Sequence, residues 1–104
     1  MENKKHEYVG RIVIVRYNRA GVFFGTLTDF ESATREAKLE NVRRVYFCDG
    51  AATLSQMAME GVKRPSNCKI TMAVDEMRVM EVIELLPCTD EAIANLKSIV
   101  VWKR

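Results

Sequence analysis

The residues with the clearest chemical potential lie in residues 43–61, RRVYFCDGAATLSQMAMEG. Two arginines and two aromatic residues occupy a predicted strand, which ends at Asp49-Gly50 where a predicted helix begins. The first N–H groups of a helix lack intrahelical partners, and small residues let an anion approach them. Guanidinium groups grip phosphates, and aromatic faces stack on bases. This combination is typical of a site for an anion or a nucleotide.

We therefore predict a ligand-binding site in which arginines hold phosphates, aromatic rings stack a base, and the turn before the helix offers N–H and hydroxyl groups. Its candidate residues are Arg43, Arg44, Tyr46, Phe47, Gly50, Ala51, Ala52 and Thr53. Phe23 and Tyr17 are further candidates for stacking, and Arg16 and Arg19 near the first predicted turn are further candidates for binding phosphate.

A purely structural interpretation of the same stretch stays open. Asp49 or Gly50 would then cap the helix, the aromatic rings would belong to the core, and the arginine stems would cover them with their charged ends in water. The charged residues near the first turn would likewise only keep the hairpin soluble.

Catalytic and metal-binding chemistry has few candidate groups in this sequence. The one histidine, His6, lies in a polar N-terminal segment that we expect to be frayed, and no phosphate-binding loop, dinucleotide fingerprint or nucleophile elbow is present. Cys48, Cys68 and Cys88 are widely spaced without a C-x-x-C pair, so we predict free thiols and no metal. Cys48 and Cys88 each precede a predicted helix, where they are either reactive thiols or small core residues. We predict a protein that is not an enzyme and needs no cofactor.

Composition indicates one small globular domain. The 104 residues are 48% hydrophobic and 29% charged, which suits a chain with a real core. The net charge is +2 and is spread evenly over the two halves, so binding to nucleic acid is disfavoured. No apolar run approaches the length of about 20 residues that a membrane span needs, and the N-terminus lacks the apolar core of a signal peptide. We expect a cytoplasmic protein without a membrane partner.

The hydrophobic pattern predicts an α+β fold: a small, strongly bent antiparallel sheet or an SH3- or Sm-like barrel with two short helices. Strands are predicted over residues 8–17, 22–28, 36–40, 43–48, 68–73, 77–86 and 100–102, and helices over 51–60 and 90–98. Gly25 within a strand predicts a bulge or a close approach of the backbone, and Thr89 is the predicted cap of the second helix. We predict that residues 1–7 are a flexible tail and that residues 8–104 form the single domain.

The order of several motifs resembles a family of small uncharacterised proteins from tailed phages and prophages. The motifs are AGVFFGTL (20–27), NVRRVYFCDGAATLSQMAMEGV (41–62), NCK (67–69), EVIELLPCT (81–89) and VVW (100–102). The chain departs from the family pattern at Val42, where Ala is expected, at Tyr46 and Phe47, where Trp and Tyr are usual, and at Thr53, where Ser is usual. The resemblance implies a phage origin, a place in the host cytoplasm and a domain of unknown function, and it carries over no catalytic residue.

Two functions are consistent with this resemblance. The first is a non-catalytic accessory protein that sequesters a nucleotide second messenger and so blunts host defence, working as a homo-oligomer with pockets between subunits. The second is an inhibitor that binds a host defence protein, or a small structural or assembly protein, through exposed methionines or a sheet edge.

Overall fold

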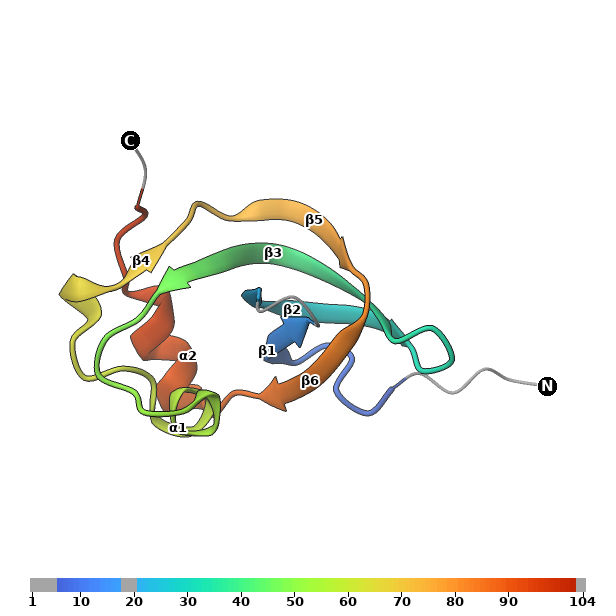
Figure 1. Ribbon diagram of the computed structural model, residues 1–104, viewed down its shortest axis with the longest axis horizontal. Coiled ribbons are helices and arrows are strands. Elements are labelled where there is room, and N and C mark those ends of the chain that lie inside the picture. The colour runs from blue at the N-terminus through green and yellow to red at the C-terminus, as the bar shows by residue number, and fades with distance from the viewer. Residues whose placement is uncertain (1–5, 18–20, 103–104) are drawn as a thin grey trace.

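The computed structural model describes residues 6–17 and 21–102 and has the predicted α+β architecture (Figure 1). Its strands are β1 (Ile12–Tyr17), β2 (Val22–Glu31), β3 (Glu36–Phe47), β4 (Lys69–Ile70), β5 (Val74–Val79) and β6 (Val82–Pro87). Its helices are α1 (Leu54–Glu60) and α2 (Asp90–Lys97), with a 3-10 turn at Pro65–Asn67.

The six strands form one strongly bent antiparallel sheet. The order of the strands is β4-β3-β2-β1-β6, and β5 pairs with β3 beside β4. Only Met80 and Glu81 separate β5 from β6, so the chain passes directly from the β3 side of the sheet to the β1 side (Figure 1). The bent sheet was predicted from sequence; its assignment to an SH3- or Sm-like barrel stays a prediction.

The bend creates two cores on opposite faces of the sheet. Val13 and Val15 of β1 belong to a core enclosed by the curved strands, together with Leu27 and Leu39. Ile14, between them, faces a second core that the two helices cover. Side chains alternate across a strand, and both cores use this alternation in β1, which is why its middle is buried on both faces.

Two bulges in the pairing of β2 with β3, one between Phe24 and Thr26 and one between Leu27 and Asp29, allow these long strands to follow the bend. The pairing of β2 with β3 shifts register between Phe24 and Thr26, which confirms the bulge predicted at Gly25. A β-carbon at Gly25 would lie 3.1 Å from the carbonyl oxygen of Glu40, so the two backbones approach closely there. On the facing strand, β3, Asn41 has a φ of +52°. The predicted break at Asn41-Val42 is therefore a local kink within one strand, β3, where two strands were predicted.

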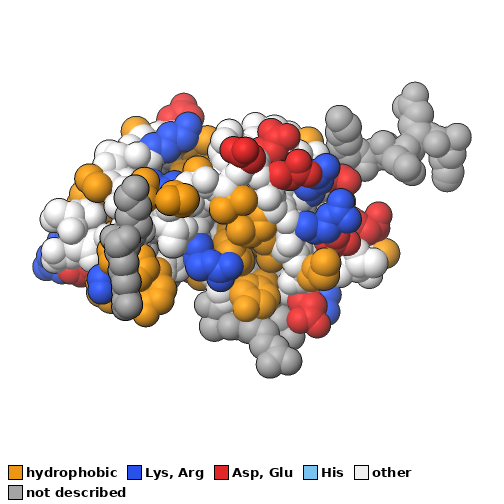
Figure 2. Space-filling view, turned by 90° about the horizontal axis from the view of Figure 1, so that it is seen from above, with side chains coloured by type: hydrophobic (Ala, Val, Ile, Leu, Met, Phe, Trp, Pro, Cys, Tyr) orange, Lys and Arg blue, Asp and Glu red, His pale blue; other side chains and the backbone are white. Residues whose placement is uncertain are grey.

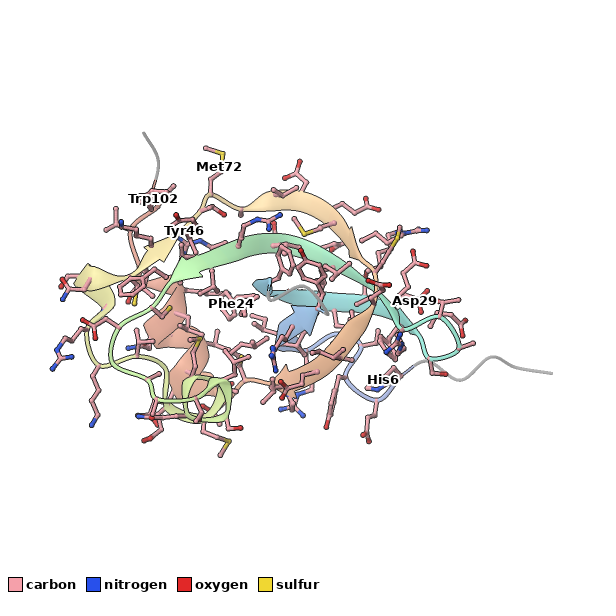
Figure 3. The ribbon with its side chains drawn as sticks, in the orientation of Figure 1. His6, Phe24, Asp29, Tyr46, Met72 and Trp102 are labelled. Carbon is pink, nitrogen blue, oxygen red and sulfur yellow. The ribbon has the colours of Figure 1, made fainter. Side chains whose placement is uncertain are left out.

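Other boundaries differ from the prediction for local reasons. Residues 7–10 form turns before β1, and His6, expected to be frayed, packs its ring edge-on against Tyr8 and Phe30 at 5.0 and 5.2 Å (Figure 3). The predicted strand 77–86 is split at Glu81, whose φ is +56°. Residues 100–102 contribute a single parallel bridge between Val101 and Ile70. The remainder of the predicted tail, residues 1–5, lies outside the described residues.

The second helix has the predicted cap and the first begins later than predicted. The Thr89 hydroxyl accepts a hydrogen bond from Ala92 N, and Asp90 and Glu91 occupy the first turn of α2, where the helix dipole favours acids. In α1 the cap is Thr53, so the helix starts at Leu54 and residues 51–53 lie outside it.

Candidate functional site

Arg43 and Arg44 are neighbours in sequence, but they point to opposite faces of β3. Arg43 is 9% exposed and faces the helices. Its guanidinium donates to four backbone carbonyls: Nε to Thr71 O at 2.8 Å, Nη2 to Ile70 O at 3.3 Å and Ile99 O at 3.0 Å, and Nη1 to Leu96 O at 3.5 Å. The last two carbonyls lie at the C-terminal end of α2, where partial negative charge gathers. Burial lowers the pKa of Arg43.

This geometry corrects the phosphate-binding role predicted for Arg43. Its guanidinium ties β4 and the end of α2 to β3 and is directed into the interior. The sequence shows two adjacent arginines on a strand, and alternation places one of them inside. Sequence alone did not indicate that carbonyl groups at the end of a helix would satisfy the inward one.

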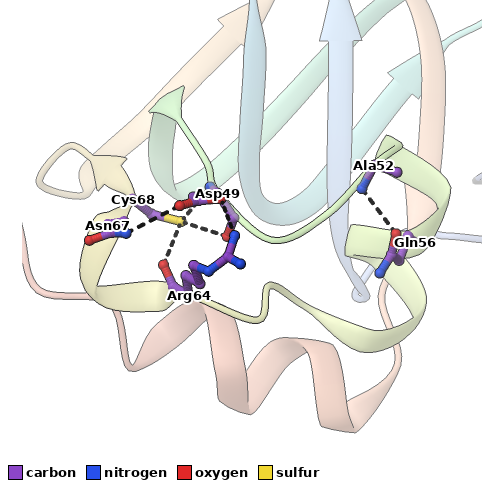
Figure 4. Close-up of polar contacts among 6 residues, drawn as sticks. All are labelled: Asp49, Ala52, Gln56, Arg64, Asn67 and Cys68. Atoms are coloured by element: carbon purple, nitrogen blue, oxygen red, sulfur yellow. Dashed lines mark hydrogen bonds and ion pairs between the residues drawn. The ribbon is translucent and has the colours of Figure 1, made fainter.

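The turn before α1 is partly accessible, and several of its polar groups have partners within the chain. Ala52 N donates to Gln56 Oε1 at 3.0 Å (Figure 4). Gln56 N in turn donates to Thr53 Oγ1 at 3.1 Å. Thr53 is thus the helix cap, as in a capping box. Gly50 has φ at +98°, and its carbonyl accepts from Lys63 N. Gly50, Ala51, Ala52 and Thr53 therefore serve the local fold, with α1 only seven residues long.

Asp49 organises the base of this turn. Its carboxylate accepts from Arg64 Nη1 at 3.0 Å and from Asn67 Nδ2 at 3.1 Å, while its backbone N donates to Cys68 Sγ at 3.2 Å (Figure 4). The hydrogen bonds from Asn67 and Arg64 lower the pKa of the Asp49 carboxyl. Asp49 is thus the centre of a hydrogen-bonded loop network, and the N-cap of α1 is Thr53.

Arg44 lies on the accessible face of β3, at the mouth of the space that the bent sheet encloses. Its guanidinium carbon is 4.7 Å from the centroid of the Phe23 ring, and the ring of Tyr17 is 6.1 Å from that of Phe23. A groove of about 390 Å³ opens here, lined among others by Tyr17, Phe23, Arg44, Met77, Arg78 and Glu81. The structure thus brings together three of the residues that sequence singled out, one arginine and two aromatic side chains.

Arg78 and Glu81 were not foreseen as part of this groove. They flank the corner between β5 and β6, which the sequence pattern presented as one continuous strand. Arg78 Nε lies 3.1 Å from Glu36 Oε1 in an exposed ion pair. Among the described residues, no carboxylate oxygen lies within 4 Å of the Arg44 guanidinium, so its charge is available in the groove.

Tyr46 and Phe47 lie apart from the groove. Tyr46 is 65% exposed and stacks on Trp102 with ring centroids 4.9 Å apart, at the end of the molecule near β4 (Figure 3). Lys69 Nζ lies 5.5 Å from the centroid of the Trp102 ring. Phe47 follows a bulge in the pairing of β3 with β4 and is half-exposed. Trp102 and Lys69 were missed because they are far from Tyr46 in sequence.

Arg16 does not line the groove. Arg16 Nη1 forms an exposed ion pair with Glu84 Oε1 at 3.0 Å, across the pairing of β1 with β6. Arg19 lies outside the described residues.

The cysteines are free thiols packed into the helix-covered core. Burial, together with the neighbouring Cys68, raises the pKa of the Cys48 thiol to about 12, and burial raises that of Cys88 to about 11. These shifts run opposite to those of a reactive thiol beside a helix N-terminus.

Because the thiolate is the reactive form, we expect iodoacetamide to alkylate Cys48 and Cys88 at pH 7.5 at least tenfold more slowly than it alkylates glutathione. Both rates should rise by about tenfold per pH unit up to pH 10, since each pKa lies above that range. Peptide mapping by mass spectrometry measures each site separately. Labelling of either site as fast as glutathione would show an activated thiol.

Neither helix of the described residues has the length and apolar character that crossing a membrane requires. In residues 6–17 and 21–102, no three His, Cys, Asp or Glu side chains gather in a way that would hold a metal ion.

Comparison with known proteins gives one result. No curated protein and no solved structure matches the chain. A family described as Domain of unknown function (DUF6948) matches residues 10–96, a range that includes β1 to β6, α1 and most of α2. The chain therefore belongs to the DUF6948 family.

Proposed function

We propose that this protein is a non-catalytic phage accessory protein that binds a nucleotide-type signalling molecule and withholds it from a host defence system. The binding site in this proposal is the groove around Arg44. The observation that carries the proposal is an accessible guanidinium, without a carboxylate partner among the described residues, lying over an aromatic ring at the mouth of the bent sheet.

The groove has the size and chemistry that a nucleotide requires. Its volume of about 390 Å³ falls within the range of about 300–1,000 Å³ for small-molecule sites. The partly exposed ring of Tyr17 offers aromatic surface for a base, the buried Phe23 forms the floor beneath Arg44, and Arg44 offers a planar fork of donors for a phosphate. Arg78 adds a second positive charge at the same opening, and Glu81 adds an acceptor for the N–H groups of a base.

The phage origin, the host cytoplasm and the homo-oligomeric state are parts of this proposal that rest on the resemblance of the motifs described above. Native mass spectrometry of freshly purified protein reports the number of subunits and any retained small molecule together. A co-purified nucleotide that leaves on denaturation would identify the ligand directly.

Calorimetry against a panel of cyclic nucleotides, cyclic dinucleotides and ADP-ribose derivatives tests the binding. We expect at least one of them to bind with a Kd below about 100 μM, and the Arg44→Gln variant to bind it about 10- to 100-fold more weakly. The reason is that a charge-assisted hydrogen bond to phosphate contributes about 1.5–3 kcal/mol.

The matched control is Arg16→Gln, which also removes one exposed arginine but lies outside the groove. It should leave the affinity within about twofold. Equal weakening by both changes would indicate that only overall charge matters, and absence of binding below 100 μM across the panel would end the sequestration proposal.

A protein partner is the second candidate, favoured by the exposed apolar side chains near β4. Tyr46 is 65% exposed, and Met72, on the link between β4 and β5, is 52% exposed (Figure 3). Figure 2 shows hydrophobic side chains interspersed with charged ones over the face viewed there, as on many interaction surfaces. The methionines predicted to contact a partner are Met57, Met59, Met77 and Met80; Met57 is buried, Met77 is half-buried, and Met59 and Met80 are exposed. Capture of one stoichiometric host protein, lost in Tyr46→Ala and retained in Arg44→Gln, would favour this function over ligand binding.

A further inference from the structure

Cys48 and Cys68 face each other across the last step of a strand pair. β3 and β4 are antiparallel, and after a bulge Phe47 is the register partner of Lys69. One residue further along each chain, the same register places Cys48 opposite Cys68. Directly opposed residues of antiparallel strands have Cα atoms about 4.5–5.5 Å apart, which is within the range of about 4.4–6.8 Å that a disulfide spans.

Contacts around Cys68 confirm that its sulfur is directed toward Cys48. Cys68 Sγ accepts from Asp49 N at 3.2 Å, and this nitrogen is bonded to the carbonyl carbon of Cys48 (Figure 4). Both side chains border the helix-covered core, and Cys68 is 8% exposed whereas Cys48 is half-buried.

The third cysteine is placed differently. Cys88 follows β6, where its backbone N donates to Ile12 O at 3.0 Å, and it is 4% exposed. It lies on the β1 side of the sheet, whereas Cys48 and Cys68 lie at the β3–β4 edge. Cys48 and Cys68 are therefore the one pair of cysteines that lie opposite each other in register and could form an intramolecular bridge.

We propose that Cys48 and Cys68 form a reversible intramolecular disulfide that staples the end of β3 to the start of β4. Two S–H bonds break and one S–S bond forms, and the two protons and two electrons pass to an oxidant of the diazene or organic-disulfide class. With diamide the product is the corresponding hydrazine, and with oxidised glutathione it is two glutathione thiols. The bridge closes the loop that carries α1 and the 3-10 turn.

The bridge is expected to form slowly and to stabilise the fold. The attacking species is a thiolate, and the high pKa of Cys48 keeps that form scarce at neutral pH. Once formed, the bond restricts the unfolded chain over a loop of about 20 residues, which predicts a rise in Tm of roughly 15 °C.

The test treats the purified full chain with excess diamide at pH 8.5 and then alkylates the remaining thiols with N-ethylmaleimide under denaturing conditions. Intact mass should show one adduct where the untreated protein shows three, since the chain has three cysteines. Non-reducing peptide mapping should join Cys48 to Cys68. Dithiothreitol should restore three adducts and remove the rise in Tm.

Single variants give the controls. Cys88→Ser should form the same bridge with the same rise in Tm, whereas Cys48→Ser and Cys68→Ser should show no intramolecular bridge. Three adducts after treatment of the wild-type protein, a bridge that includes Cys88, or linkage between two chains in place of the internal bond would each overturn the proposal. The wild-type result does not depend on any variant folding.

Discussion

Replacing Arg43 by methionine is expected to lower the free energy of unfolding by about 3–5 kcal/mol, because buried carbonyl oxygens are left without a hydrogen-bond donor at about 1–3 kcal/mol each. Methionine fills a similar volume with an unbranched side chain, but it donates no hydrogen bond. Four carbonyl oxygens, of Ile70, Thr71, Leu96 and Ile99, lose the guanidinium donor. Ile70 O still accepts from Trp102 N and Leu96 O from Ile99 N, so the loss falls on Thr71 O and Ile99 O. Urea unfolding with the slope and midpoint fitted together measures the effect, and Tm should fall by roughly 15–25 °C.

The adjacent arginine provides the matched control. Arg44→Met removes the same side chain one residue along β3, but there the guanidinium is exposed and lies over Phe23 without a hydrogen bond among the described residues. Its cost should stay within about 1 kcal/mol, as for most surface changes. Arg43→Lys keeps the charge but not the planar fork, so it should recover only part of the loss. Equal costs for the two methionine variants would contradict the structural role given to Arg43.

The fold was predictable from sequence where a local signal had a local cause. Gly25 marks a bulge because a side chain there would crowd two close backbones, and Thr89 followed by two acids marks a helix start. The signals failed where tertiary pairing determines the outcome. Asn41 tolerates a left-handed conformation, which suits either a turn or a kinked strand, and pairing with β2 and β5 decides for the strand. Pairing also decides the corner at Glu81, because β5 pairs with β3 whereas β6 pairs with β1.

The candidate site was predictable only in part, because its members meet through the bend of the sheet. Alternation along β3 separates Arg43 from Arg44, but it does not say which face is open. The groove joins Phe23 and Arg44, which are register partners, to the corner between β5 and β6. The adjacency of that corner depends on how far the sheet curves. Residues 50–53 form a capped turn because Gln56, three residues after Thr53, completes the cap.

The junction between the two helices depends on the absence of a side chain at Gly61. This residue ends α1 with φ at +82° and ψ at −150°, a conformation that is almost restricted to glycine. The Asn95 side chain of α2 packs against its α-carbon. The side-chain amide of Asn95 forms two hydrogen bonds with Val62, the residue after Gly61. Its Oδ1 accepts from Val62 N at 2.8 Å, and its Nδ2 donates to Val62 O at 3.0 Å. These two bonds fasten the end of α1 to α2.

Gly61→Ala is therefore expected to cost about 3 kcal/mol of folding free energy, by the sum of backbone strain and loss of the Asn95 hydrogen bonds. An added β-carbon would lie 2.7 Å from Asn95 Cβ, too close for two carbon atoms, so the Asn95 side chain must leave its position. Gly10→Ala separates the two causes, because Gly10 also has a positive φ, +93°, but no atom lies within 4 Å of its added β-carbon. It should cost only about 1 kcal/mol. Asn95→Ala should account for most of the difference in cost between Gly61→Ala and Gly10→Ala. The double variant of Gly61→Ala and Asn95→Ala should cost less than the sum of the two single changes, because both remove the same pair of hydrogen bonds. Equal costs at Gly61 and Gly10 in urea unfolding would show that strain alone acts and that Asn95 does not join the helices.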